Sequence, residues 1–143
     1  MTINQISIFI ENKPEALAKL TGVIAENKIN LKSLSIADST DFGIVRIIVD
    51  DSEKVSKILT EKDYLVKITG VIAVAIPDEA GSLNKILTVM AKNGRNVEYM
   101  YGFTGKKTNT ACMIIRTTDI TAAEKVLSDN NIRMISQDGI EEL

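Results

Sequence analysis

Apolar residues alternate with polar ones near the start of the chain and then recur at helical spacing. In residues 6–10, isoleucine occupies every second position, which is typical of a strand with one buried face. Residues 17–27 carry apolar side chains three or four positions apart and predict a helix. Two more alternating segments, 29–37 and 43–49, flank a polar turn and predict a hairpin. A second helix from residues 50–52 and a fourth strand at 64–68 complete the first half.

The same order of elements returns in the second half. The predicted strands are 71–76, 97–103, 110–116 and 132–136, and the predicted helices are 81–92 and 120–128. Gly94 follows the first of these helices, where a helix stop favours a positive φ. Each half is therefore βαββαβ, the ferredoxin-like order, in which both helices cover one face of a four-stranded antiparallel sheet. We predict an α+β protein of two tandem modules, 1–69 and 70–143, packed side by side.

An internal repeat supports two modules. The segment IENKPEAL at residues 10–17 reappears as IPDEAGSL at 76–83, 66 residues later (76 − 10 = 66), and the register holds as far as Asn30 and Asn96. A period of this length exceeds that of solenoid repeats and suffices for a small domain with its own core. Residues 68–71 join the two modules with almost no linker, so the modules are expected to be close neighbours.

Several predicted strands are apolar on both faces. They are VIAVAI at 71–76, ACMII at 111–115 and IVRIIV at 44–49. A sheet covered by helices on one side only should alternate apolar with polar residues. The uncovered face is therefore expected to pack against another surface, most economically a second copy of the chain across a two-fold axis. The sequence predicts a homodimer, with an open apolar face as the alternative.

Composition and charge narrow the function. The chain is 45% hydrophobic and 25% charged with two prolines, as in a folded protein. A net charge of −2 gives no positive field for nucleic acid or an anionic membrane, and the basic pair Lys106-Lys107 is expected at a loop tip. There is no membrane span or signal peptide, which predicts the cytoplasm. Histidine is absent and Cys112 is the one cysteine, expected buried, so we predict no catalytic site, metal or cofactor.

The turn after the first strand of each module is the most informative place. Asn12 is expected to cap the first helix, with Pro14 and Glu15 in its first turn. A helix start presents unpaired N–H groups and a partial positive charge, which suit the carboxylate of a free amino acid. Oxygen acceptors for the ligand's ammonium group are available on Asn12, Asp78, Asn30 and Asn96. The alternative is that these residues are ordinary caps and turn residues and that Leu17 and Leu83 are ordinary core.

These turns resemble those of the ACT domain, a small-molecule sensing module. That family has D/N-x-P-G-x-L after the first strand and an N-I or N-V pair that opens the second. Here the first module reads NKPEAL and then NL, and the second reads DEAGSL and then NV, so the resemblance covers the whole chain as two copies. The ligand-binding residues that the resemblance implies are Asn12, Lys13, Pro14, Glu15, Ala16, Leu17, Asn30, Leu31, Asp78, Glu79, Ala80, Gly81, Ser82, Leu83, Asn96 and Val97.

The resemblance also implies how the ligand is held. In ACT domains that pack side by side, the ligand lies at the seam and touches the turn of one module and the second strand of the other. This pairs the Asn12 turn with Asn96 and the Asp78 turn with Asn30. The first turn has Glu15 where glycine is usual. Because glycine lets the backbone approach a ligand closely, we expect the second turn, with Gly81, to be the better site although it has alanine in place of proline.

Other functions remain open alternatives. The chain could be a non-catalytic regulatory or assembly subunit that docks onto a separate metabolic enzyme without a ligand. RNA binding on a βαββαβ fold needs aromatic residues on the central strands and positive charge, and the third strands IVRIIV and ACMIIR have no aromatic residue. An enzyme would have to use Arg46, Arg116, Tyr99 or Tyr101; the two tyrosines could instead pack within the sheet or shape the ligand pocket.

Overall fold

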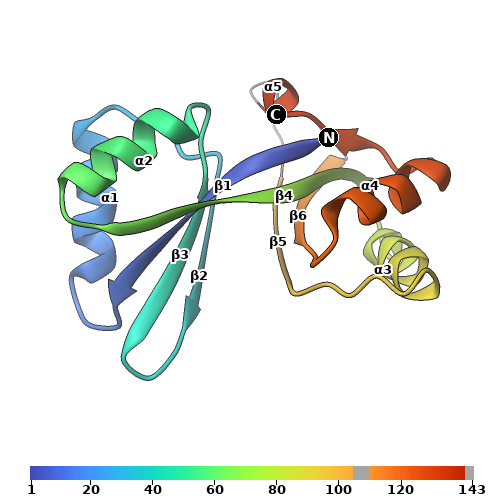
Figure 1. Ribbon diagram of the computed structural model, residues 1–143, viewed down its shortest axis with the longest axis horizontal. Helices are drawn as coiled ribbons and strands as arrows, with labels where there is room; N and C mark the ends of the chain where they lie inside the picture. Colours follow the sequence, from blue (N-terminus) through green and yellow to red (C-terminus); the bar gives the residue numbers. More distant parts are fainter. Residues whose placement is uncertain (105–109, 141–143) are drawn as a thin grey trace. The chain divides into compact units, whose positions relative to one another are not determined.

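The computed structural model describes residues 1–104 and 110–140 and contains two compact units (Figure 1). The N-terminal unit is Asn4–Thr69, and the C-terminal unit begins at Gly70 and includes Met1–Ile3. The first three residues group with the second half because Thr2 packs on the strand there: a Cβ added at Gly70 would lie 2.7 Å from Thr2 Cγ2. Lys106 and Lys107 lie outside the described residues.

The N-terminal unit has the predicted βαββαβ order. Its elements are β1 Thr2–Glu11, α1 Ala16–Glu26, β2 Ser33–Asp38, β3 Phe42–Ile48, α2 Ser52–Glu61 and the first part of β4 Leu65–Pro77. β1 and β2 both pair antiparallel with β3, with Ile8 opposite Val45 and Ile36 opposite the same Val45. The strand order in this unit is β2-β3-β1-β4, which confirms the ferredoxin-like prediction.

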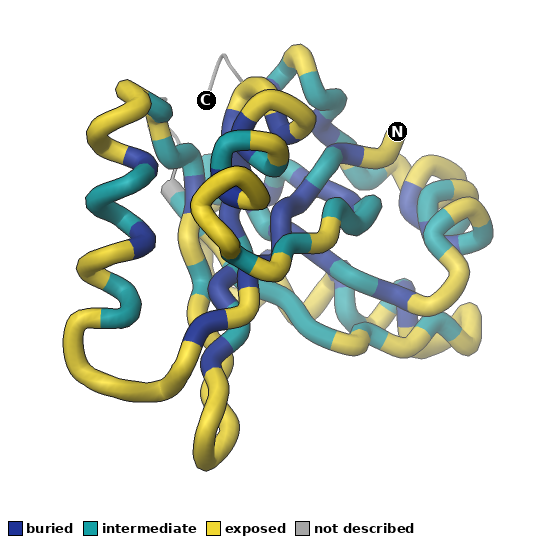
Figure 2. Tube along the Cα trace, turned by 60° about the vertical axis from the view of Figure 1, so that its left-hand side comes forward, coloured by how far each residue is buried: buried dark blue, intermediate teal, exposed yellow. Residues whose placement is uncertain are grey.

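The core of this unit lies between the sheet and its two helices. Ile6, Ile8 and Ile10 of β1 are buried in one cluster with apolar residues of both helices. Figure 1 shows the paths of α1 and α2, and Figure 2 shows how buried and exposed positions are interspersed along the chain. The helices contribute Leu20, Ile24, Val55 and Leu59. Since each fully buried aliphatic side chain contributes about 1.5–3 kcal/mol, this layer holds both helices on one face of the sheet.

The C-terminal unit repeats the pattern with one change at its end. Its elements are the rest of β4, α3 Ser82–Lys92, β5 Tyr99–Thr104, β6 Thr110–Arg116, α4 Ile120–Asp129, β7 Met134–Ile135 and α5 Gln137–Ile140. The strand order is β5-β6-β4-β7. The predicted last strand is shortened to two residues, because Gly139 N–H donates to Ser136 Oγ (3.2 Å) and the chain turns there into α5.

The predicted cap of the first helix is wrong. α1 begins at Ala16, with Glu15 as its N-cap residue, so Pro14 and Glu15 precede the helix. Asn12 instead ties the turn to the β2–β3 hairpin: its Nδ2 donates to Ser39 O and its backbone N–H to Asp41 O, both at 3.0 Å. The predicted start of α2 is correct, since Asp51 caps it by accepting from Lys54 N–H at 3.0 Å.

The sheet face away from the helices differs between the units. In the N-terminal unit it carries Phe9 and Phe42, which are 39% and 58% exposed and border a hollow of about 300 Å³. In the C-terminal unit the equivalent strands carry Ala73, Cys112 and Ile114 on this face, and all three are buried. The open apolar face therefore belongs to the N-terminal unit. None of the helices in the described residues is long and apolar enough to span a membrane.

Two non-glycine residues of the N-terminal unit adopt backbone conformations that glycine adopts in the repeat. Glu15 has φ 70° where Gly81 has φ 90°, and Lys28 has φ 55° where Gly94 has φ 65°. A left-handed conformation costs an L-residue about 1–2 kcal/mol because its Cβ crowds the following carbonyl oxygen. The N-terminal unit thus has this backbone strain at both ends of α1.

Replacing Glu15 with glycine should stabilise the protein by roughly 0.5–1 kcal/mol, because the strain that is removed, about 1–2 kcal/mol, exceeds the extra backbone entropy that glycine loses on folding. The side chain of Glu15 is exposed, so its removal costs little packing. Urea unfolding of the variant measures the effect. Glu26→Gly, in the last turn of α1, is the matched control and should cost about 0.5–1 kcal/mol. Equal destabilisation by both substitutions would contradict the assignment of strain to Glu15.

Candidate functional site

The two turns that lead into α1 and α3 have the same backbone hydrogen bonds at the repeat offset. Lys13 N–H donates to Glu11 O (3.0 Å), as Glu79 N–H does to Pro77 O (2.9 Å). The first hydrogen bonds of the two helices also match: Lys19 N–H donates to Glu15 O at 2.8 Å, and Lys85 N–H donates to Gly81 O at 3.1 Å. The glycine position of the motif therefore requires a left-handed backbone, and Glu15 meets this requirement at the cost described above.

The starts of α1 and α3 differ from those of the other two long helices. Asp51 and Asp119 cap α2 and α4, each accepting a backbone N–H at 3.0 Å. Within the described chain, no side chain caps α1 or α3. The first N–H of each helix, from Ala16 and Ser82, donates to a carbonyl of the turn, Lys13 O (3.4 Å) or Glu79 O (3.3 Å). The N–H groups that follow have no side-chain acceptor among the described residues, and the helix dipole there favours a negative charge.

The sixteen predicted site residues fall into three groups by burial. The exposed ones are Asn12, Lys13, Pro14, Glu15, Asn30, Asp78, Glu79, Ala80, Gly81, Leu83 and Asn96; the half-buried ones are Ala16, Leu17, Leu31 and Val97. Ser82 alone of the set is buried, with 4% of its surface exposed. Leu83 is 37% exposed, so its interpretation as an ordinary core residue is wrong, whereas Leu17 packs against the core.

Asn30 and Asn96 lie before the strands that they were expected to open. β2 begins at Ser33 and β5 at Tyr99, so both asparagines belong to the preceding connections. Their side chains are exposed. The predicted pairing of each turn with the asparagine of the other unit stays a prediction.

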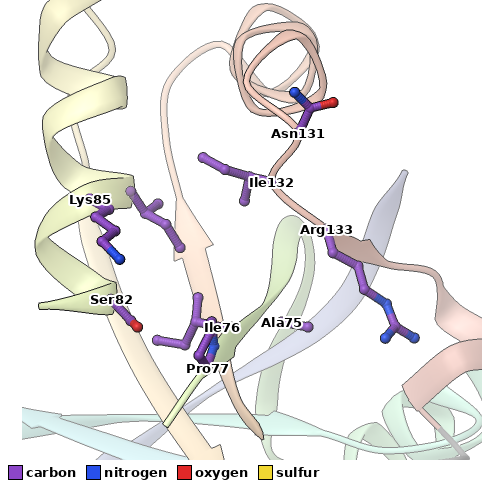
Figure 3. A pocket seen from close by; sticks show the side chains of 9 residues that line it. Ala75, Ile76, Pro77, Ser82, Lys85, Asn131, Ile132 and Arg133 are labelled. Carbon is purple, nitrogen blue, oxygen red and sulfur yellow. The ribbon is translucent and has the colours of Figure 1, made fainter. Parts of the chain in front are cut away.

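A cavity of about 300 Å³ lies beside the start of α3 in the C-terminal unit (Figure 3). It is lined by Ala75, Ile76, Pro77, Ser82, Lys85, Ile86, Asn131, Ile132 and Arg133. Apart from Ser82, none of these is among the predicted site residues. The segment 131–133 comes from the loop before β7, which only the folded chain brings beside α3.

The N-terminal unit has a smaller cavity in the equivalent place. Its volume is about 200 Å³, and its lining is Phe9, Ile10, Glu11, Lys13, Ala16, Lys19 and Tyr64. Lys19 corresponds to Lys85, but Ala16 replaces Ser82. Glu11 and Lys13 form an exposed ion pair at this cavity, and the Lys13 ammonium group lowers the pKa of the Glu11 carboxyl. The two cavities therefore share a lysine and differ in their other polar groups.

The Ser82 hydroxyl is the unusual polar group of the larger cavity. Its Oγ is buried and has no hydrogen-bond partner among the described residues. An unsatisfied buried hydroxyl costs about 1–3 kcal/mol. The fold does not need this hydroxyl, since alanine occupies the same position of the repeat in the N-terminal unit. Nothing in the sequence alone marked Ser82 as different from the rest of its turn.

A comparison with known protein families assigns this chain to a family. The family model described as an ACT domain pair matches residues 1–143. The chain belongs to the ACT domain-pair family. ACT domains are regulatory modules that typically sense amino acids. The match over residues 1–143 confirms the ACT resemblance of the whole chain.

Solved structures agree with this assignment. Protein BT0572 from Bacteroides thetaiotaomicron is 36% identical, with a TM-score of 0.92 over 100% of this chain and 98% of that one. The regulatory subunits of aspartate kinase from Thermus thermophilus and Thermus flavus are 16% and 17% identical, with TM-scores of 0.59 and 0.57. They align with 88% of this chain and with 91% and 90% of their own lengths, and show a shared fold. No protein with a curated description matches the sequence.

The arginine and tyrosine residues that an enzyme would have to use lie within the sheet of this ACT domain pair and take part in its local contacts. Arg116 donates from Nη1 to Gly70 O (3.0 Å) and pairs through Nε with Glu98 (3.2 Å). Tyr99 and Tyr101 are half-buried on β5, and Tyr99 lies opposite Arg116. Among the described residues, no three histidine, cysteine, aspartate or glutamate side chains are grouped to hold a metal.

Cys112 is buried in β6, as the sequence predicted. Only 1% of its surface is exposed, and this burial raises the pKa of its thiol to about 12. A thiol with so high a pKa carries almost no thiolate at neutral pH, and the thiolate is the reactive form. Cys112 therefore belongs to the packing of the sheet.

Proposed function

We propose that this ACT domain pair is a regulatory protein that binds a free amino acid at the turn before α3. The observation that carries the proposal is the contrast between helix starts: α2 and α4 are capped by aspartates, whereas α1 and α3 have no side-chain cap. The uncapped N–H groups would receive the ligand's carboxylate. The exposed carboxylate of Asp78 would receive its ammonium group.

An asparagine would complete the site. In ACT domains that pack side by side, the second strand of one module contributes to the site at the turn of the other. On this pattern Asn30 would serve the Asp78 turn and Asn96 the Asn12 turn. Both side chains are exposed and carry an amide oxygen that can accept from an ammonium group.

The turn before α1 is proposed as the weaker site. Glu15 adopts nearly the same backbone as Gly81, so the backbone geometry does not separate the two turns. The difference is the negative charge of Glu15, the residue directly before α1, close in sequence to the N–H groups that would bind the ligand's carboxylate. Repulsion between like charges would lower the affinity of this turn for an amino acid.

An amino-acid screen tests the proposal. One proteinogenic amino acid should raise the melting temperature in proportion to the logarithm of its concentration, because it binds only the folded state; at 100 times Kd the stabilisation is about 2.7 kcal/mol. Asp78→Ala should abolish this response. Asp38→Ala, an exposed aspartate of the β2–β3 hairpin, is the control and should retain it. A screen in which no amino acid shifts the melting temperature would reject amino-acid sensing.

The open sheet face of the N-terminal unit supports a second proposal, a homodimer. Phe9 and Phe42 expose 39% and 58% of their surfaces beside the hollow on this face. A second copy that covers them would bury this apolar surface across a two-fold axis. Docking of a separate metabolic enzyme on the same face is the alternative, suggested by neighbours described as regulatory subunits of aspartate kinase.

Light scattering after size exclusion should give twice the chain mass at micromolar concentration, because the apolar face would be covered in the dimer. Phe42→Lys should convert the protein to a monomer, since a lysine there would bury a charge. Ile36→Lys is the matched control: Ile36 is also exposed, at 50%, but it pairs with the core residue Val45 and so lies on the helix face of the sheet, and this variant should remain dimeric. A monomeric wild-type protein would refute the homodimer and leave the enzyme as the proposed partner of this face.

A further inference from the structure

The cavity beside α3 has an apolar wall and one polar end. Ile76, Ile86 and Ile132 supply the apolar part. The Ser82 hydroxyl and the Lys85 side chain both come from the first turn of α3 and lie on the same side of the cavity (Figure 3). A volume of about 300 Å³ is at the lower end of small-molecule sites, which suits a ligand of a few heavy atoms.

The polar end presents donors that have no partner, or only a weak one, among the described residues. The Ser82 hydroxyl is 96% buried (100 − 4) and has no partner among the described residues. The adjoining helix start has no side-chain cap. Lys85 contributes an ammonium group whose one ion pair, with Glu79 at 3.7 Å, is exposed and therefore weak. All three features are satisfied by one anionic group with two oxygens.

The charged residues that line the cavity indicate which kind of anion it would bind. Lys85 and Arg133 are the charged residues of the lining, and both are cations. The guanidinium of Arg133 points away from Ser82, so it adds to the field without reaching the polar end (Figure 3). No carboxylate lines the cavity to receive an ammonium group. An anion with an apolar tail and no ammonium group matches this lining better than an amino acid does.

We propose that the C-terminal unit binds a small aliphatic carboxylate in this cavity. One carboxylate oxygen would accept from the Ser82 hydroxyl and the start of α3, the other from the Lys85 ammonium, and the tail would pack against Ile76, Ile86 and Ile132. Asp78 and the two asparagines of the proposed amino-acid site do not line the cavity. Both ligands would place a carboxylate at the start of α3, so they would compete for that end of the site. The proposal adds a second ligand class, and the residues that distinguish it, Ser82, Lys85 and the apolar wall, do not depend on amino-acid sensing.

The repeat restricts the site to the C-terminal unit. The equivalent cavity keeps a lysine, Lys19, but has Ala16 in place of Ser82 and contains the Glu11 carboxylate. It thus lacks a hydroxyl at the helix start, where Ser82 has one, although Tyr64 lines the cavity, and it includes a negative charge. This cavity provides a natural control within the same chain.

Calorimetric titration of the whole chain with isovalerate tests the proposal. Isovalerate carries a carboxylate on a branched apolar tail and should bind with one site per chain. Isoamylamine, which has a similar tail with an ammonium group, should not bind. Inorganic phosphate separates a carboxylate site from a general anion site, and it should bind more weakly than isovalerate because it has no apolar tail to bury.

Ser82→Ala and Lys85→Met should each weaken isovalerate binding about tenfold or more, because each removes a hydrogen bond to a charged group. Ser82→Ala should leave the melting temperature of the free protein unchanged or higher, since Ala16 occupies the same position of the repeat. Lys19→Met is the matched control and should bind like the wild type. Asp78→Ala should also keep isovalerate binding, which separates this site from the amino-acid site.

Three results would overturn the proposal. They are no binding of isovalerate, equal or tighter binding of isoamylamine or phosphate, and unchanged affinity in Ser82→Ala. The outcome of the amino-acid screen does not decide this proposal, because isovalerate binding is measured separately.

Discussion

The left-handed residue before α1 and α3 is the constraint on which both candidate sites depend. Glu15 and Gly81 turn the chain sharply out of a strand and into a helix. Asn12 bonds to the β2–β3 hairpin and not to α1, and no side chain of the described residues caps α1 or α3. The same two helices that lack caps are those that follow the ACT motif. We infer that the missing caps reflect a function in binding.

The two units carry two versions of the same strand–turn–helix that differ at particular residues. Gly81 and Gly94 relieve the backbone at both ends of α3, whereas Glu15 and Lys28 hold the same conformations under strain. The buried hydroxyl of Ser82 is present in the C-terminal unit alone, because Ala16 is its counterpart. The N-terminal unit instead exposes Phe9 and Phe42 on its sheet. These differences suggest that one unit binds ligands and that the other presents a surface for association.

Much of the fold could be predicted from the sequence, because the alternation of residues 6–10 and the 66-residue repeat are local or periodic signals. The start of α2 could also be predicted, since Asp51 accepts a hydrogen bond from the nearby Lys54 N–H. Asn12 was misinterpreted because its partners, Ser39 and Asp41, lie in a distant hairpin. The cavity beside α3 could not be predicted, because it forms only when the chain folds and brings residues 131–133 to the start of α3, and no local sequence signal marks that contact.

The central claim is that the uncapped start of α3 is the anion-binding end of a ligand site. Amide resonances in two-dimensional NMR, followed during titration with the amino acid identified by screening, test it most directly. The account predicts that the largest shifts occur at the amides of Leu83 and Asn84, the first N–H groups of α3 that lack an acceptor, and that the capped start of α4 at Ala122 is unaffected. Saturable shifts that leave Leu83 and Asn84 unchanged would contradict it.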